Sequence, residues 1–163
     1  MTTVVCKQCI FIKDNGQRCK RRTCVRKDYC WQHLRSQKGV DVRPSTLPGA
    51  GLGLFAYKTF RPKEKVADYS GKIVSARKAK RSQYAIAWKR GKWVDASSSQ
   101  DPVGRYANTC RGADKKSKRC KGNNVKIKRD FRRRTIILRA GKKKIKRGEE
   151  IFNTYGSGFR IVR

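Results

Sequence analysis

The 163-residue sequence predicts a mainly β domain of several small sheets, preceded by a small zinc-binding module. Two observations carry this prediction. After Pro48, short apolar runs alternate with glycine, proline or basic residues, a pattern typical of short strands joined by turns. Before it, five of the seven cysteines and the only histidine lie close together in a segment with few aliphatic residues, which is typical of a metal site.

The N-terminal segment, residues 1–37, is too poor in apolar residues to form a core, and a bound Zn²⁺ would supply the missing folding energy. Cys30 and His33 form a short-loop chelating pair, and an Asn15-Gly16 turn can return the chain toward them. Cys6 and Cys24 remain alternatives, because six candidates exceed the four positions of a structural zinc site. The preferred ligands are Cys9, Cys19, Cys30 and His33.

Residues 38–41 are expected to form a linker to a domain over 42–158, with a short tail at 159–163. Within the domain, residues 76–84 favour a helical turn or two. The expected strands are Gly53–Tyr57, Lys65–Tyr69, Lys72–Ser75, Tyr84–Trp88, Trp93–Ala96, Val125–Lys128, Thr135–Ala140 and Glu150–Tyr155.

The charge of the chain is strongly one-sided: 44 Lys and Arg against 11 Asp and Glu give a net charge of +33. Such a surplus attracts polyanions, so nucleic acid is an expected partner. No apolar run is long enough to span a bilayer, and the first residues lack a secretory pattern, so we expect no membrane association and an intracellular location. In that setting the cysteines are expected to be metal ligands or free thiols rather than disulfides.

Three segments carry a family resemblance. The first is Gly49–Ala56 with Lys63–Gly71. The second is Arg105–Cys110, preceded by Trp93–Ala96 and followed by Asn123–Val125, and the third is Arg147–Gly156. In this order they resemble the conserved segments of SET domains, over about Val42 to Tyr155.

The resemblance implies a SET fold, in which the last two segments form a pseudoknot, and a protein-lysine methyltransferase that uses S-adenosylmethionine. Tyr155 would orient the target amine and the methyl group, and Tyr84 would line the lysine channel. An apolar channel favours the uncharged amine that attacks the methyl group. By the same resemblance, and with Phe159 as a stacking partner of the adenine, the residues expected to contact the cofactor are Leu52, Gly53, Leu54, Asn108, Thr109, Tyr155 and Phe159.

The sequence departs from the family pattern at Thr109 and Cys110, where His and Ser are usual, and an inserted loop follows at residues 111–122. Asn153 stands where an aromatic residue often controls how many methyl groups are added. A cysteine cluster after the catalytic tyrosine is missing. The small size and the front module resemble SET proteins encoded by large DNA viruses.

We therefore expect a lysine on a histone or another nucleoprotein as the substrate, near nucleic acid. The location would be the host nucleus or the virion if the protein is viral, and otherwise the nucleus. The alternative is a non-catalytic nucleic-acid-binding or packaging protein that retains a SET-like fold. Automethylation of its many lysines could accompany either function.

Overall fold

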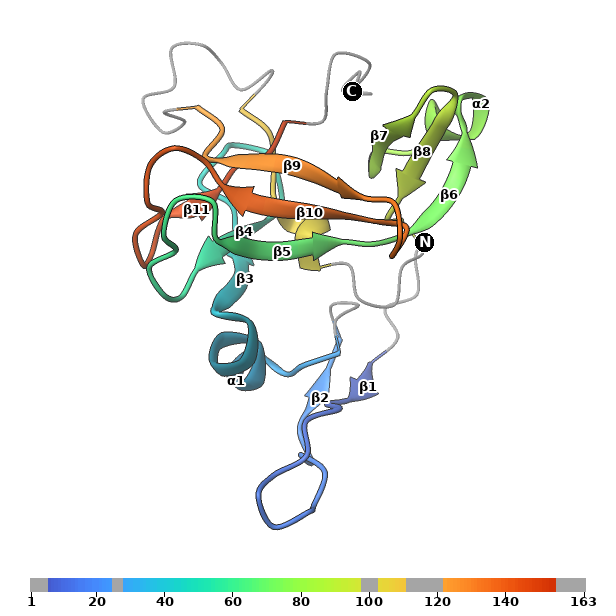
Figure 1. Cartoon of the computed structure of the whole chain (residues 1–163). Helices are drawn as coiled ribbons and strands as arrows, with labels where there is room; N and C mark the ends of the chain where they lie inside the picture. Colours follow the sequence, from blue (N-terminus) through green and yellow to red (C-terminus); the bar gives the residue numbers. More distant parts are fainter. Residues whose placement is uncertain (1–5, 25–27, 98–102, 111–121, 155–163) are drawn as a thin grey trace.

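The computed structural model describes residues 6–24, 28–97, 103–110 and 122–154, and Figure 1 shows the arrangement of their strands and helices. Most of the elements are short strands, which confirms the predicted mainly β fold. The strands are β1 (Lys7–Gln8), β2 (Arg22–Thr23), β3 (Val40–Pro44), β4 (Leu52–Ala56), β5 (Lys65–Tyr69), β6 (Lys72–Ser75), β7 (Ala85–Lys89), β8 (Lys92–Asp95), β9 (Val125–Asp130), β10 (Thr135–Ala140) and β11 (Glu150–Ile151). The helical elements are α1 (Trp31–His33), the π-helical η1 (Leu34–Lys38), α2 (Ala76–Ala79) and the 3₁₀ segment η2 (Val103–Tyr106).

The strands of the domain form three antiparallel sheets of three strands each, in the orders β11-β4-β3, β5-β10-β9 and β6-β8-β7. Strands β1 and β2 form a separate two-stranded ribbon in the N-terminal module. In Figure 1 the module extends away from the domain, and the sheet β6-β8-β7 lies at the opposite end from it.

The expected strand positions agree closely with those observed. Strands β5, β6 and β10 have the predicted bounds, and β4, β7 and β8 are displaced by one residue. The expected strand 150–155 is shorter, because after Ile151 the chain leaves the sheet and pairs with residues 108 and 124 instead. The expected helical stretch 76–84 is likewise reduced to the single turn α2. Strand β3 was not predicted as a strand; it begins at Val40, inside the expected linker, because Val40 is buried and pairs with Ala56.

One hydrophobic core joins the three sheets. Its largest fully buried side chains include Tyr69, Phe60, Leu54, Ile86, Ile136, Leu138, Ile145 and Ile151. Leu34 of η1 is also fully buried in this cluster, and Tyr29 packs against it. The N-terminal module is therefore packed onto the domain rather than tethered to it. Among the described residues, no helix is long and apolar enough to cross a membrane.

Candidate functional site

The three sequence segments that suggested a function meet at one place in the fold. Strand β4, which follows the glycine-rich turn, pairs with β11 through Phe55 and Glu150. Asn108, from the second segment, forms a parallel bridge with Phe152, and the backbone N–H of Asn153 donates to the Asn108 carbonyl oxygen at 2.7 Å. The junction therefore lies directly before Tyr155 in the chain.

The side chain of Asn108 connects the first and third segments. Its Nδ2 donates to the carbonyl oxygen of Leu52 at 3.0 Å and lies 3.4 Å from Oε1 of Glu150. Two residues that were expected to contact the cofactor, Leu52 and Asn108, are thus neighbours, although 56 residues separate them in the sequence. Both retain some solvent exposure, so a ligand can reach them.

Glu150 is the buried carboxylate that holds this junction, with only 6% of its surface exposed. Its Oε1 accepts from the Ser45 hydroxyl at 2.6 Å, and its Oε2 accepts from the backbone N–H and the hydroxyl of Thr46 at 2.8 and 2.5 Å. A buried carboxylate is tolerated when such donors replace water. A Cβ at Gly53 would overlap Oε1, so Gly53 is needed to make room for Glu150.

Asn124 fixes the path of the chain beyond β11. Its Oδ1 accepts from the backbone N–H of Phe152, and its Nδ2 donates to the carbonyl oxygen of Glu150, both at 2.8 Å. Backbone bonds from Asn124 and Val125 to the Phe152 carbonyl oxygen reinforce this contact. Neither Glu150 nor Asn124 was predicted as a site residue, although both lie in the segments that resemble SET domains. The sequence signal that could have found them is a polar residue next to an apolar run.

Asn153 is completely buried, and neither its Oδ1 nor its Nδ2 has a hydrogen-bond partner among the described residues. Leaving a buried amide unsatisfied costs about 1–3 kcal/mol. A buried polar group without a partner calls for an explanation such as a bound ligand, ion or water. An amide offers both a donor and an acceptor, so the side chains of Asn108 and Asn153 suit a polar ligand. Gly49 and Gly51 have positive φ, and no described atom lies within 4 Å of a Cβ added at either position.

Tyr69 and Tyr84 lie next to each other. The hydroxyl of Tyr69, which is fully buried, donates to the Tyr84 carbonyl oxygen at 2.7 Å. The Arg105 guanidinium lies 3.8 Å from the centre of the Tyr84 ring and so covers one face of it. Only the opposite face and the edge of Tyr84 remain for lining a channel. Tyr69, which the sequence reasoning left without a role, holds the Tyr84 backbone in place.

The other residues expected to contact the cofactor differ in how accessible they are and in whether the structure describes them. Leu54 is fully buried, so only its main chain can serve a ligand, and Thr109 is half-buried beside Asn108. Tyr155 and Phe159 lie outside the described residues. Their roles, like those of the other cofactor contacts, stay predictions.

The four preferred zinc ligands come together in the N-terminal module. The donor atoms of Cys9, Cys19, Cys30 and His33 all lie within 4.8 Å of one another. Nδ1 of His33 is 3.4 Å from the sulfurs of both Cys9 and Cys30. The edge of a tetrahedral site with Zn–S near 2.3 Å and Zn–N near 2.0 Å is about 3.5 Å, so the donor set fits Zn²⁺.

The thiols of this cluster have different surroundings. Burial raises the pKa of the Cys9 thiol, whereas a hydrogen bond from the Arg21 backbone lowers the pKa of Cys19. The three cysteines are almost fully buried, and the Phe11 ring stacks on His33 at a centroid distance of 3.9 Å. The cluster thus forms the centre of the module in place of an aliphatic core.

Cys6 and Cys24, the alternative ligands, are instead bonded to each other in a disulfide. The expectation that the cysteines are only metal ligands or free thiols is therefore wrong for this pair. The pairing follows from the ribbon: Lys7 lies opposite Thr23, so the two cysteines at its open end face each other. Local spacing could not show this register.

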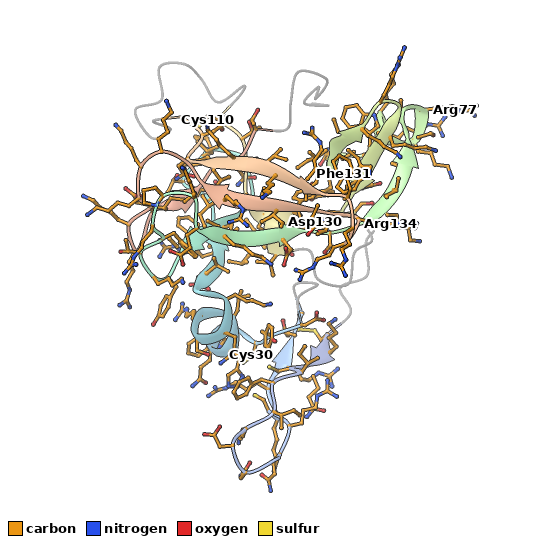
Figure 2. The ribbon with its side chains drawn as sticks, in the orientation of Figure 1. Cys30, Arg77, Cys110, Asp130, Phe131 and Arg134 are labelled. Atoms are coloured by element: carbon orange, nitrogen blue, oxygen red, sulfur yellow. A yellow bond between two sulfur atoms is a disulfide. The ribbon has the colours of Figure 1, made fainter. Side chains whose placement is uncertain are left out.

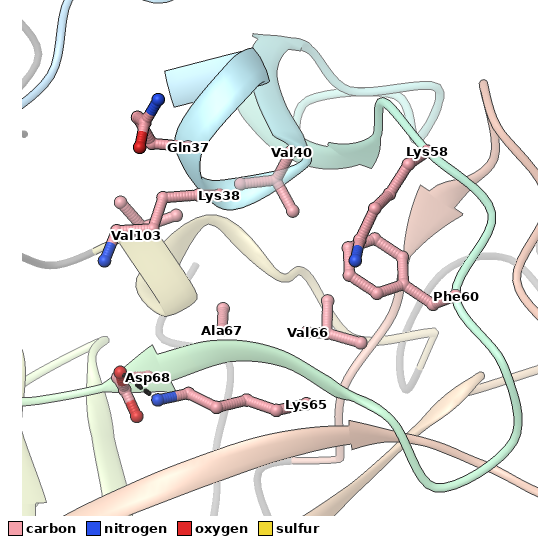
Figure 3. A pocket seen from close by; sticks show the side chains of 10 residues that line it. All are labelled: Gln37, Lys38, Val40, Lys58, Phe60, Lys65, Val66, Ala67, Asp68 and Val103. Carbon is pink, nitrogen blue, oxygen red and sulfur yellow. Dashed lines mark ion pairs between the residues drawn. The ribbon is translucent and has the colours of Figure 1, made fainter. Parts of the chain in front are cut away.

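Two hollows lie beside these sites. The smaller, about 270 Å³, separates η1 and β3 from β5; its floor is apolar, and lysines surround it (Figure 3). Of these lysines, Lys65 pairs with Asp68 and Lys58 with Glu64, each at 2.7 Å. The larger, about 770 Å³, borders Glu150 and Asn124 and is rimmed by Lys126 and Lys142–Lys144. Neither hollow is lined by Leu52, Asn108 or Tyr84, so neither coincides with the expected cofactor and lysine contacts.

Comparison with solved structures finds similar folds in polycomb repressive complex 2. A crystal structure of the Chaetomium thermophilum complex matches with 27% sequence identity and a TM-score of 0.58 over 75% of this chain. The same complex in an autoinhibited conformation bound to S-adenosylmethionine matches with 27% identity and a TM-score of 0.57 over 75%. A structure in complex with H3K27me3 and H3K27M matches with 25% identity and a TM-score of 0.58 over 77%.

This chain spans only about 16% of the length of the first of these structures' chains. A comparison with curated protein sequences finds no match.

Three small antiparallel sheets around a junction of three distant segments define a SET-type fold. A SET domain model matches residues 51–156, and the chain belongs to the SET domain family.

Proposed function

We propose that this protein is an S-adenosylmethionine-dependent protein-lysine N-methyltransferase that acts on a histone or another nucleoprotein lysine near nucleic acid. The observation that carries the proposal is the junction itself: Asn108 contacts both Leu52 and Glu150, so the three segments typical of SET domains are assembled as one site. The similar fold bound to S-adenosylmethionine supports the choice of cofactor.

The residues of this chain would act mainly by positioning and by excluding water. S-adenosylmethionine, when bound, supplies the methyl group as part of a sulfonium. The main chain at Leu52 and the Asn108 side chain would hold the ligand, and Tyr155 would orient the target amine. The apolar surroundings near Tyr69 and Tyr84 would disfavour a charged lysine, lowering its pKa so that the neutral amine can attack.

The charge of the chain and the similar structures support the proposed substrate class. A surface with a net charge of +33 repels a free basic tail but attracts the DNA to which such a tail is bound. The similar complex with H3K27me3 supports a histone as the class of substrate. A place in the nucleus or in a virion, a viral source and a zinc-bound module belong to the same proposal.

The first experiment is transfer of tritium from labelled S-adenosylmethionine to core histones and to reconstituted nucleosomes, with wild type and Tyr155→Phe. We expect label in protein, more on nucleosomes at physiological salt, and a loss of about 100-fold or more in the variant. Tyr57→Phe is the matched control, because it removes a single hydroxyl at a position that has no predicted role in the site. Transfer that is undetectable for the wild type, together with salt-sensitive DNA binding, would favour the packaging alternative.

A further inference from the structure

The hairpin between β9 and β10 ends in an exposed ring among arginines. Asp130 pairs with Thr135, so residues 131–134 form a four-residue loop with the sequence Phe-Arg-Arg-Arg. The Phe131 side chain is 63% exposed, the highest value among the exposed large apolar residues described. Figure 2 shows Phe131 and Arg134 at the end of this hairpin, beside the sheet that contains β7.

Arg134 ends the loop in an unusual backbone conformation. Arg134 has a φ of 51°, in the left-handed region where glycine or asparagine is favoured. A glycine would close the same four-residue turn without strain. Residues in such strained conformations cluster at functional sites and persist only where the surrounding structure holds them.

The loop is held in place from two sides. The carboxylate of Asp130 accepts from the Arg133 backbone N–H at 3.1 Å and so closes the turn. On the other side Arg129 donates from Nε to the Ala87 carbonyl oxygen at 3.1 Å, and the Phe131 ring lies 5.1 Å from the ring of the buried Trp88. The phenyl ring is thus supported by Trp88 but still open to solvent.

A single exposed apolar residue is ordinary on a protein surface. This one differs because it is the only apolar side chain in a loop with three arginines. Asp130 accepts from the turn and lies 3.9 Å from the Arg133 side chain, whereas no ion pair is found for Arg132 or Arg134 among the described residues. An open aromatic face surrounded by cations is the combination that binds single-stranded nucleic acid, by base stacking and by phosphate contacts. A duplex, whose bases are already stacked, offers nothing to the ring.

We propose that Phe131, Arg132, Arg133 and Arg134 form a docking site for single-stranded nucleic acid, with a base stacked on the Phe131 ring. Strand β7 connects this site to the proposed methyl-transfer site. Tyr84 directly precedes β7, and Trp88, which supports the Phe131 ring, lies in β7 four residues after Tyr84. Four residues of extended strand span about 13 Å. A single-stranded nucleic acid bound at the β9–β10 loop would hold its associated proteins, and so their lysines, close to the lysine channel. This last consequence rests on the proposed function, but the binding itself does not.

The test measures fluorescence anisotropy of labelled 12-nucleotide single strands and of duplexes of the same length, without S-adenosylmethionine or histone. Phe131→Ala changes no charge, so it separates a built site from the general attraction of a basic protein. We expect it to weaken single-strand binding about 5- to 100-fold and to leave duplex binding within about twofold. Ile12→Ala, which removes a 55% exposed apolar side chain from the N-terminal module, is the matched control and is expected to change neither.

Two further variants keep the proposal falsifiable. Phe131→Trp retains a stacking surface and is expected to bind the single strand at least as tightly as wild type. Changing Arg132 and Arg133 to Gln is expected to reduce the slope of log affinity against log salt by about 1.4 for the single strand. Equal single-strand affinity of Phe131→Ala, Ile12→Ala and wild type, or an unchanged salt slope, would overturn the site. Methyl transfer to free histones is measured in a separate assay, so the proposed enzymatic function can fail while the nucleic-acid site stands, or the reverse.

Discussion

The amide of Asn108 donates a hydrogen bond to the carbonyl oxygen of Leu52, 56 residues earlier, at 3.0 Å. Because the same nitrogen lies 3.4 Å from the Glu150 carboxylate, a single side chain links all three segments of the junction.

Replacing Asn108 with Asp removes the donor to Leu52 and places a second negative charge beside Glu150. We expect a loss of about 1–3 kcal/mol in the free energy of unfolding and at least a tenfold weaker affinity for S-adenosylmethionine. Urea denaturation and titration calorimetry measure the two effects. Asn15→Asp makes the same charge change at an exposed turn and should leave both quantities unchanged. Wild-type behaviour of Asn108→Asp would contradict the role given to Asn108.

Gly53→Ala should destabilise the protein because the new methyl group would displace the Glu150 carboxylate from Ser45 and Thr46. Overpacking of this kind costs about 1–3 kcal/mol. The check is a double-mutant cycle with Glu150→Ala, measured by urea denaturation. Since the clash disappears when the carboxylate is absent, the two losses should be less than additive; strict additivity would refute the explanation.

Asn153→Leu is predicted to stabilise the protein while impairing its activity. The change removes a buried amide without partners among the described residues, which should raise the free energy of unfolding by about 1 kcal/mol. If that amide serves a ligand, methyl transfer should fall at the same time. Thermal unfolding and the tritium assay give the two results, and a destabilised but fully active variant would argue against a ligand-binding amide.

Removal of zinc should destabilise the SET domain as well as the module, because Leu34 belongs to the domain core and Tyr29 packs against it. Ser in place of Cys9, Cys19 or Cys30, or Ala in place of His33, is expected to reduce bound zinc from about one ion per chain to none. Cys6→Ser and Cys24→Ser are the controls and should retain the metal. Metal analysis and thermal unfolding test this, and zinc loss in the controls would indicate another ligand set.

Stability in acid should depend on Glu64. The hydrogen bond from Lys58, helped by the Arg61 backbone N–H, holds the pKa of Glu64 below its ordinary value of 4.5. The unfolded chain therefore binds a proton first, so this contribution is complete above about pH 4.5 and is lost as the pH falls through the lower folded pKa.

Glu64→Gln should accordingly flatten the acid limb of the unfolding free energy measured by urea denaturation. The pair is partly exposed, so the effect is expected to be modest. Lys58→Gln should produce a similar flattening, since it removes the largest cause of the shift. If the free energy of unfolding falls as steeply in acid for both variants as for the wild type, the pH dependence belongs to other groups.

The sequence by itself predicted most strands of the domain and the four Cys and His residues that lie together in the N-terminal module. Short apolar runs bounded by glycine, proline or basic residues placed β5, β6 and β10 at their observed bounds, because a run of four to six such residues is typical of a strand whatever its partner. The short loop between Cys30 and His33 brought these donors together, and the turn at Asn15-Gly16 returned Cys19 to Cys9. Such contacts close short loops, so local pattern is enough to predict them.

Only the tertiary structure decided which strands pair and which polar side chains are buried. The pairing of Cys6 with Cys24 depends on the register of β1 and β2, and the burial of Glu150 depends on Ser45 and Thr46, more than 100 residues earlier. The same holds for Phe131, whose support by Trp88 joins two sheets. These contacts are set by the packing of the whole core, and no periodicity in the chain encodes a partner at such a distance.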